Sequence, residues 1–332
     1  MKKLKLIIAP LISLLIVLGI CSAVSHELMP RRMDYGSTWD RYLMEDEDSV
    51  DILVFGSSIA YCDFVPAAIY EETGLTSYVM AGPEQTIPLS YYYIKETLKT
   101  QSPQKIILEL SAMYFKEYQS YTKVNVGYMP WGLNRLAATY TASEEEERTG
   151  LLFPLYNYHS IIWDRWGHDP EDIPDYSIDM LAGHTFIGQA KPVGISTRTT
   201  ETEEDNFNKN IEYLGKIARL CEKRGIQLEL CIFPACNSLS DEDISELEQI
   251  CDSLAYGSFV NYQAQLSEMG TDLATDYFDM LHFNSAGAWK FSKYIAGTLS
   301  DLSPAAAYDA ELWSQRCEHF RSLAEEAGFV PN

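Results

Sequence analysis

Short apolar runs alternate with helical patterns along most of the chain. Four mainly apolar runs are expected to be strands, at residues 51–55, 77–81, 105–110 and 226–233. The first fits a buried strand of a parallel sheet, and the last alternates before it becomes apolar. Residues 85–100 and 206–223 instead carry their apolar positions at helical spacing. Strands alternating with helices at these intervals predict a doubly wound α/β layer structure.

Local signals mark where further elements begin and end. Pro66 and Gly74 bracket a short helix, with proline in its first turn and glycine just past its end. Ser240 is expected to cap a helix reaching about residue 255, because acidic residues follow it at the positive end of the helix dipole. A short strand at 259–262 and a long helix at 285–299 complete the pattern, followed by a trailing helix and tail.

The alternation stops in the middle of the chain, where residues 112–200 are rich in aromatic side chains. We interpret this stretch as a long insertion. Aromatic residues of such a segment form a second small core or line a substrate cleft, since sugar rings stack on aromatic faces. The candidates for the cleft are Tyr128, Trp131, Trp163 and Trp166.

The first residues predict a membrane anchor. Leu6–Val24 is nearly all apolar and, at 19 residues, is just long enough to span a hydrocarbon core. Lys2, Lys3 and Lys5 precede it, so the positive-inside rule leaves the N-terminus in the cytoplasm and the body outside the cell membrane. The protein is therefore expected to be single-pass and largely extracytoplasmic. A cleaved signal peptide ending near Ala23 is the alternative.

These boundaries divide the chain into an anchor, a linker and an interrupted α/β domain. The expected segments are an anchor at 1–24, a juxtamembrane linker at 25–49, the first part of the domain at 50–111, the insertion at 112–200, the second part of the domain at 201–300, and a C-terminal helix and tail at 301–332.

Charge and cysteine content exclude several classes of function. The formal net charge is −23, and because the first 32 residues carry +4, the remaining 300 carry −27. So acidic a body repels phosphate backbones, which excludes nucleic acid as a partner. The seven cysteines include no C-x-x-C pair, and no histidine lies at metal-binding spacing from any of them. We expect no metal site and no cofactor, while one disulfide remains open.

Two short motifs carry candidate chemistry. Gly56-Ser57-Ser58 follows the first apolar run, and in open α/β sheets ligands bind at the carboxyl ends of strands. Asp279 and His282 lie three residues apart on a loop before the last long helix. A serine nucleophile needs a base, and the base needs an orienting carboxylate. Each motif is common by itself, but together they predict a Ser58–His282–Asp279 site. His184, in a glycine-containing loop, is the best other candidate for a base.

Together the two motifs resemble the SGNH/GDSL hydrolase superfamily, over about residues 50–111 and 201–300. The resemblance implies a three-layer α/β/α fold with a flavodoxin-like sheet. It makes Ser58 the nucleophile, with Ser57 where the family usually has aspartate, and it assigns Asp279 and His282 to the last conserved block. Gly82 matches the glycine whose N–H joins that of Ser58 in the oxyanion hole.

One departure concerns the third oxyanion donor, an asparagine in the family. The matching strand end reads Glu109-Leu110-Ser111, so Ser111 or Gln85 substitutes, or the donor is missing. Loss of one such donor raises the barrier by roughly 2.7–4 kcal/mol. Slow turnover, or transfer assisted by a partner, is easier to reconcile with this sequence than fast hydrolysis.

The anchor, the Gly-Ser-Ser variant and the insertion look like a branch that assists O-acylation of cell-envelope polymers, as in alginate O-acetylation and lipoteichoic acid D-alanylation. That resemblance implies a serine acyltransferase or esterase acting on an envelope glycan or teichoic acid beside a polytopic membrane-bound O-acyltransferase. The alternative is a catalytically weak or inactive binding subunit of such a complex. A secreted lipase-like hydrolase is disfavoured because the sequence shows no apolar lid.

Overall fold

A parallel sheet forms the centre of the computed structural model, which describes residues 2–28, 39–158, 178–200 and 202–331. Its strands are β1 (Ile52–Phe55), β2 (Ser77–Val79), β3 (Lys105–Glu109), β5 (Gln227–Ile232) and β7 (Ser258–Asn261). They lie in the order β2-β1-β3-β5-β7, and every neighbouring pair is parallel. In chain order this is 2-1-3-4-5, a doubly wound arrangement. The predicted α/β fold with a mostly parallel sheet is confirmed.

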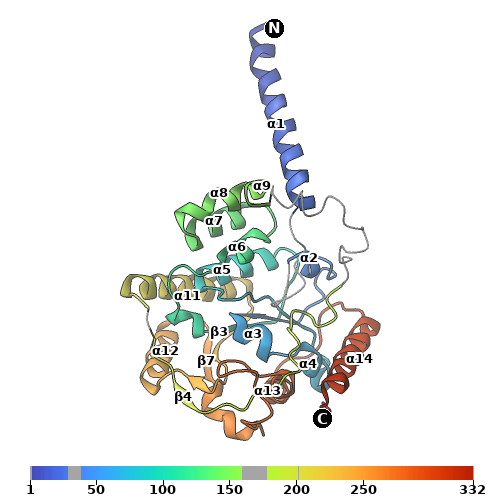
Figure 1. The fold of residues 1–332 in the computed structure, drawn as a ribbon, viewed down its shortest axis with the longest axis vertical. Coiled ribbons are helices and arrows are strands. Elements are labelled where there is room, and N and C mark those ends of the chain that lie inside the picture. Colours follow the sequence, from blue (N-terminus) through green and yellow to red (C-terminus); the bar gives the residue numbers. More distant parts are fainter. Residues whose placement is uncertain (1, 29–38, 159–177, 201, 332) are drawn as a thin grey trace.

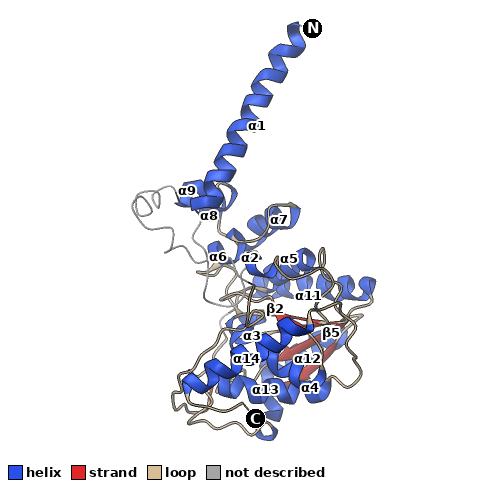
Figure 2. Ribbon diagram, turned by 90° about the vertical axis from the view of Figure 1, so that its right-hand side faces the viewer, coloured by secondary structure: helices blue, strands red, loops and turns tan. Residues whose placement is uncertain are grey.

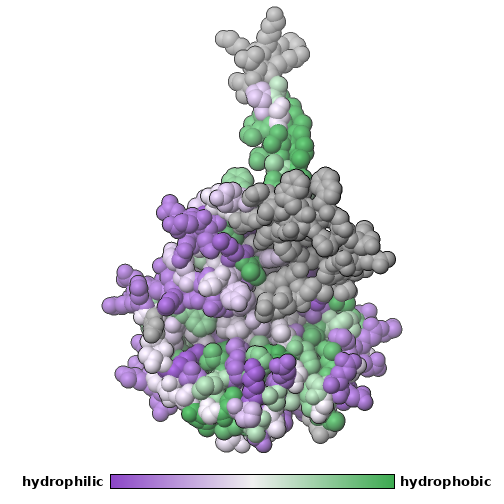
Figure 3. Space-filling model, in the orientation of Figure 1, coloured by the Kyte–Doolittle hydropathy of each residue, from purple (hydrophilic) through white to green (hydrophobic). Residues whose placement is uncertain are grey.

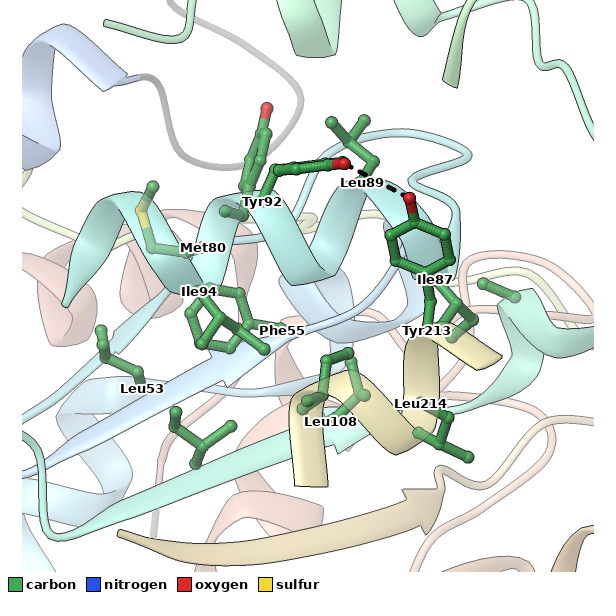
Figure 4. Packing of buried hydrophobic residues seen from close by; sticks show 14 of the residues in the cluster. Leu53, Phe55, Met80, Ile87, Leu89, Tyr92, Ile94, Leu108, Tyr213 and Leu214 are labelled. Atoms are coloured by element: carbon green, nitrogen blue, oxygen red, sulfur yellow. Dashed lines mark hydrogen bonds between the residues drawn. The ribbon is translucent and has the colours of Figure 1, made fainter. Parts of the chain in front are cut away.

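One face of the sheet is covered by α5 (Ile87–Thr97) and α11 (Glu204–Arg224). Successive residues of a strand point to opposite faces, so Leu53 and Phe55 of β1 reach this side. Figure 4 shows them beneath α5, with Leu214 of α11 beside them. The helices bury a continuous apolar cluster here, which fixes α5 and α11 against the sheet.

The other face is covered by α4 (Pro66–Thr73) and α13 (Ser285–Thr298), with α14 (Ala310–Ala327) packed against α4. Ile52 and Val54 point to this side and join the second apolar cluster. Because neighbouring residues of β1 enter different clusters, this strand is buried on both faces, as its uninterrupted apolar sequence predicts.

The predicted end signals are present. Gly74 caps α4 with φ +73°, in the left-handed region that favours glycine. The Ser240 side chain accepts a hydrogen bond from the N–H of Asp243, whose carboxylate accepts in return from the Ser240 backbone, at the start of α12 (Asp241–Ser253). This reciprocal pair satisfies two N–H groups that the helix itself leaves without partners.

The N-terminal helix α1 (Lys2–Leu28) extends away from the body (Figure 1). Its segment Ile8–Ser25 has a mean hydropathy of 2.4 and is long and apolar enough to cross a membrane, a property that a signal sequence shares. Figure 3 shows apolar side chains along this helix, in contrast to the mixed surface of the body. The side chains of 8–20 are exposed, so nothing in the described protein covers them.

The stretch expected to be a linker is only partly outside the domain. α2 (Trp39–Tyr42) places both of its aromatic residues in the core, where their rings meet edge to face. Glu45 pairs with Arg316 of α14, and both side chains are buried. Residues 39–45 therefore pack against the domain, although they precede the expected boundary at residue 50.

In the part of this region that the structure describes up to residue 158, four α-helices follow β3: α6 (Thr122–Gly127), α7 (Leu133–Ala142), α8 (Glu145–Leu152) and α9 (Pro154–Tyr158). α7 packs on α5, and α9 contacts α1. Figures 1 and 2 both show α8 and α9 beside the end of α1 nearest the body. These helices form a layer between the α/β domain and α1.

The aromatic residues of this region have different surroundings. Tyr128 is partly buried against the core, whereas Trp131 is 52% exposed. Trp163 and Trp166 lie outside the described residues. Other described elements are short, among them the parallel pair β4 (Ser196–Thr197) and β6 (Asn237–Ser238), and the 3-10 helices η1 (Ser111–Tyr114) and η3 (Tyr262–Glu268). All seven cysteines are free thiols, so the one disulfide left open by the sequence is not formed.

Candidate active site

A continuous chain of hydrogen bonds joins Ser58, His282 and Asp279. The Ser58 Oγ lies 2.8 Å from His282 Nε2. On the opposite side of the ring, His282 Nδ1 lies 2.9 and 3.0 Å from the two carboxylate oxygens of Asp279. With Nδ1 protonated and donating to Asp279, Nε2 is the acceptor for the Ser58 hydroxyl. The contacts expected from the sequence are thus present across 224 positions of chain.

Ser58 stands at the carboxyl end of β1, as the first residue of α3 (Ser58–Asp63). β1 lies between β2 and β3, where the direction of winding reverses and ligands bind in doubly wound sheets. Ser58 is partly exposed, whereas the Ser57 hydroxyl is fully buried. Only the second serine of the pair can therefore meet a substrate.

Gly56 makes the sharp turn from β1 into α3 possible. Its φ of +154° lies in the region that side-chain-bearing residues rarely adopt. A Cβ at this position would also lie 2.9 Å from the Cβ atoms of Ala60 and Glu109. Glycine therefore lets the chain turn directly above β3 and present Ser58.

The loop that carries His282 is held rigid by its own backbone. Tyr277 and Phe283 form an antiparallel bridge, and the N–H of Phe278 donates to the His282 carbonyl at 3.0 Å. The Asp279 carboxylate accepts from the N–H groups of Leu281 at 2.7 Å and His282 at 2.9 Å. Asp279 is therefore oriented before any substrate arrives.

The charge state of Asp279 follows from these contacts. Partial burial raises its pKa, but the hydrogen bond and charge interaction with His282, together with the two N–H groups, lower it further. The net result holds the pKa of Asp279 below its ordinary value. Asp279 is thus an anion that accepts the hydrogen bond of His282 Nδ1.

A second, buried carboxyl ties α3 to the same loop. Asp63, the last residue of α3, accepts a hydrogen bond from the N–H of Phe283 at 2.9 Å. Burial raises the pKa of Asp63 well above its ordinary value, although that hydrogen bond lowers it. A protonated Asp63 keeps its accepting oxygen and carries no buried charge. Nothing in the local sequence marks this residue, because its partner is 220 positions away.

Gly82 lies on a loop after β2 that is packed against α6. A Cβ at Gly82 would lie 2.2 Å from Asn125 Oδ1, so only glycine fits. Asn125 is buried, and its amide donates to the carbonyl of Pro83 at 2.8 Å. Asn125 thereby fixes the position of this loop. In the part of the chain that the structure describes, the N–H groups of Ser58 and Gly82 donate no hydrogen bond, which leaves them available to an oxyanion.

The two other candidates for an oxyanion donor have their hydrogens committed elsewhere. The Ser111 hydroxyl donates to Glu109 Oε1 and accepts from Arg198 Nη2 at 2.9 Å. The buried Gln85 amide, just before α5, donates to Ser90 Oγ at 3.0 Å and to the Met80 carbonyl at 3.5 Å. Neither side chain is free to turn its hydrogen toward a substrate.

Ser111 connects the buried carboxylate of Glu109 to the partly buried guanidinium of Arg198 through two hydrogen bonds. Glu109 is buried at the end of β3, where desolvation raises its pKa and the bonds from Ser111, with the charges of Arg198 and His282, oppose that rise. Arg198 directly follows β4, and its guanidinium reaches Ser111 at the same end of the sheet. The hydrogen bonds from Ser111 and the nearby positive charge of Arg198 offset part of the cost of burying the carboxylate. The sequence marks neither residue, because each is an ordinary charged residue in an ordinary segment.

His184 is not placed to act as a base. Its ring is buried, and Nε2 lies 3.2 Å from Ser285 Oγ. The centre of the ring lies 5.9 Å from that of Phe320. Burial lowers the pKa of His184 to about 4. This histidine is a neutral packing residue on the face of the domain that carries α13 and α14.

Comparison with known proteins adds no assignment to this geometry. Among the described residues, no group of three or more His, Cys, Asp or Glu side chains is arranged to hold a metal ion. No model of a protein family matches the chain, and no curated protein matches it at a significant level. The interpretation of the site therefore rests on the arrangement of Ser58, His282 and Asp279.

Proposed function

We propose that this protein is a membrane-anchored serine acyltransferase or esterase of the SGNH type. The observation that carries the proposal is the hydrogen-bonded chain Ser58–His282–Asp279, which ends in the hydroxyl of a partly exposed serine. A strand-order reversal beside β1 and a glycine turn that presents Ser58 support the same reading. The three-layer arrangement of that superfamily is consistent with apolar clusters on both sides of the sheet.

In the first half of the reaction, Ser58 Oγ attacks the acyl carbonyl carbon while its proton passes to His282 Nε2. Asp279 stabilises the resulting imidazolium. The N–H groups of Ser58 and Gly82 bind the oxyanion of the tetrahedral intermediate. Collapse breaks the bond to the leaving oxygen, which takes the proton from His282, and the acyl group stays on Ser58 as an ester.

In the second half, His282 removes the proton of an acceptor hydroxyl, which attacks the acyl-Ser58 ester. Ser58 leaves as an alkoxide and recovers its proton from His282. The acceptor is a hydroxyl of an envelope glycan or teichoic acid, and water in its place gives hydrolysis. Support for this substrate class comes from the resemblance of the anchor, the Gly-Ser-Ser motif and the segment 112–200 to proteins that O-acylate envelope polymers. A membrane-bound O-acyltransferase supplies the activated acyl group.

The alternative is a weakly active or inactive binding subunit of the same kind of complex. This alternative is favoured because the side chains of Ser111 and Gln85 donate their hydrogens to other groups of the protein. Two backbone N–H groups, those of Ser58 and Gly82, are then left to bind the oxyanion. One missing donor reduces kcat about 10²–10³-fold. An already activated acyl donor lowers the barrier and makes that loss tolerable.

Covalent labelling of the full-length protein in detergent tests the proposal. A fluorophosphonate should modify Ser58, found by mass spectrometry of the peptide that contains it. Ser58→Ala and His282→Ala should abolish labelling. Ser57→Ala is the matched control, since its buried hydroxyl makes no hydrogen bond among the described residues and its loss should leave labelling intact.

The same variants decide between catalysis and scaffolding in cells. Normal ester-linked acyl groups on wall polymers in a strain with stably expressed Ser58→Ala protein would eliminate the catalytic role and leave the binding subunit. Loss of these groups with Ser58→Ala and His282→Ala, but not with Ser57→Ala, would establish Ser58 as the nucleophile.

A further inference from the structure

One face of α7 is apolar and exposed. Leu133 is 83% exposed, Leu136 37% and Tyr140 58%, and their spacing of three and four residues places them on one side of the helix. The opposite side, with Ala138 and Thr139, is buried toward α5. We call Leu133, Leu136 and Tyr140 the α7 face. A helix that already has its buried side gains nothing in water from a second apolar side, so such a side indicates a further contact.

The α7 face belongs to the helical layer α6–α9, which lies next to the apolar helix α1. α9 contacts α1 directly, and both views show the layer α7–α9 at the end of the body from which α1 emerges. Phe153, between α8 and α9, is 58% exposed. The apolar segment of α1 ends at Ser25, so a bilayer around α1 has its headgroup region close to α9.

The composition of this layer suits a lipid headgroup region. The rings of Trp131 and Tyr140 lie next to Arg135 and Arg148, with the guanidinium carbons 4.0 and 5.5 Å from the ring centres. Tryptophan and tyrosine are enriched at membrane–water interfaces, where one end of the side chain is apolar and the other is wet.

Charge also sets this layer apart from the rest of the body. Residues 121–158 hold three basic residues and four acidic ones, Glu144 to Glu147, a net of −1, whereas the whole chain carries −23. The acidic residues are confined to the start of α8, and Glu147 pairs with Lys123 at 3.4 Å. An anionic membrane surface repels this layer much less than it repels other faces of so acidic a protein.

We propose that the α7 face, with Trp131, rests on the headgroup region of the same bilayer that α1 crosses. The occupant is lipid. The proposal depends on α1 as a membrane anchor and not on the chemistry of Ser58. It holds the body at a fixed orientation, and it places α6, whose Asn125 supports Gly82, within the membrane-bound layer.

Site-specific labelling of the full chain in lipid nanodiscs tests this placement. Six native cysteines are buried and Cys21 lies in α1, so a Cys21→Ser background with Leu133→Cys carries one accessible thiol. An environment-sensitive fluorophore there should emit at shorter wavelength than in detergent, and lipids with a nitroxide near the headgroup should quench it several-fold. The matched control is Glu248→Cys on the exposed side of α12, which should show neither effect.

Three outcomes would overturn the proposal. Equal, weak quenching at positions 133 and 248 would show that the α7 face is in water. Quenching at 133 that disappears on adding unlabelled full-length protein would identify a second copy as its partner. A label on native Cys21 that deep-bilayer nitroxides fail to quench would refute the anchor and this proposal together. Fluorophosphonate labelling of Ser58 in the same samples reports the proposed activity separately.

Discussion

Asp63 and Phe283 connect the two halves of the candidate active site. Asp63 closes the helix that Ser58 opens, and its carboxyl accepts from the N–H of Phe283 at 2.9 Å. The residue before Phe283 is His282, which bonds to Ser58. Both ends of the short helix α3 therefore contact the loop that carries His282. These two adjacent contacts fix the distance between Ser58 and His282.

Two substitutions of Asp63 should show whether its carboxyl acts as a hydrogen-bond acceptor or as a negative charge. Asp63→Asn keeps an accepting oxygen, and because burial already raises the pKa of Asp63 well above its ordinary value, it should leave stability and Ser58 labelling near wild type. Asp63→Ala leaves the buried Phe283 N–H without a partner, which costs roughly 1–3 kcal/mol. Urea unfolding and fluorophosphonate labelling rates measure the two effects. Equal behaviour of both variants would contradict this role.

Gly82 and Asn125 should behave as an energetically coupled pair. The Cβ of Gly82→Ala would lie 2.2 Å from Asn125 Oδ1, so the loop must shift, at roughly 1–3 kcal/mol of overpacking, and Ser58 acylation should slow. Asn125→Ala removes the hydrogen bond to Pro83 but makes room. The double variant should therefore lose less than the sum of the single ones. Additive losses in acylation rate and unfolding free energy would show that the two residues act independently.

His184 should make the fold sensitive to mild acid. Its pKa is about 4 in the folded state, below the ordinary 6.5, so between these values the unfolded chain binds the extra proton. The contribution of His184 to the free energy of unfolding is therefore fully present above about pH 6.5. It is lost as the pH falls toward 4, by about 3 kcal/mol in total. Urea unfolding at pH 7 and pH 4.5 should show a smaller loss for His184→Gln than for wild type. His319→Gln, which removes an exposed histidine, should match wild type.

The sequence predicts those parts of the fold that depend on local pattern. The run at Ile52–Phe55 and the end signals at Gly74 and Ser240 act through neighbouring residues, so the elements they mark lie within a few positions of expectation. The same holds for Ser58 and His282, because each sits in a short recognisable motif.

Other parts of the fold depend on contacts between distant residues and have no local signal. The six residues of α3 are too few to show helical periodicity. Trp39 and Tyr42 lie in a polar stretch that looks like a linker, yet they fill a space made by α5 and β2. Asn125 and Asp63 matter through single hydrogen bonds to Pro83 and Phe283. A motif reveals Ser58 and His282, but the groups that fix their geometry appear only once the chain is folded.

Ser111 provides the sharpest test of the oxyanion hole. Its hydroxyl donates to Glu109 and accepts from Arg198, so its hydrogen is held away from the substrate. Ser111→Ala should therefore reduce the acylation rate by no more than a few-fold. It should lower the unfolding free energy by roughly 1–3 kcal/mol, because Arg198 loses its link to a buried carboxylate. A true oxyanion donor would behave in the opposite way, with a 10²–10³-fold loss of rate and little loss of stability. Burst kinetics with p-nitrophenyl acetate and urea unfolding of the same preparations distinguish the two. A hundred-fold slower burst in a stably folded Ser111→Ala protein would mean that substrate binding releases the hydroxyl from Glu109 and completes the hole with a third donor.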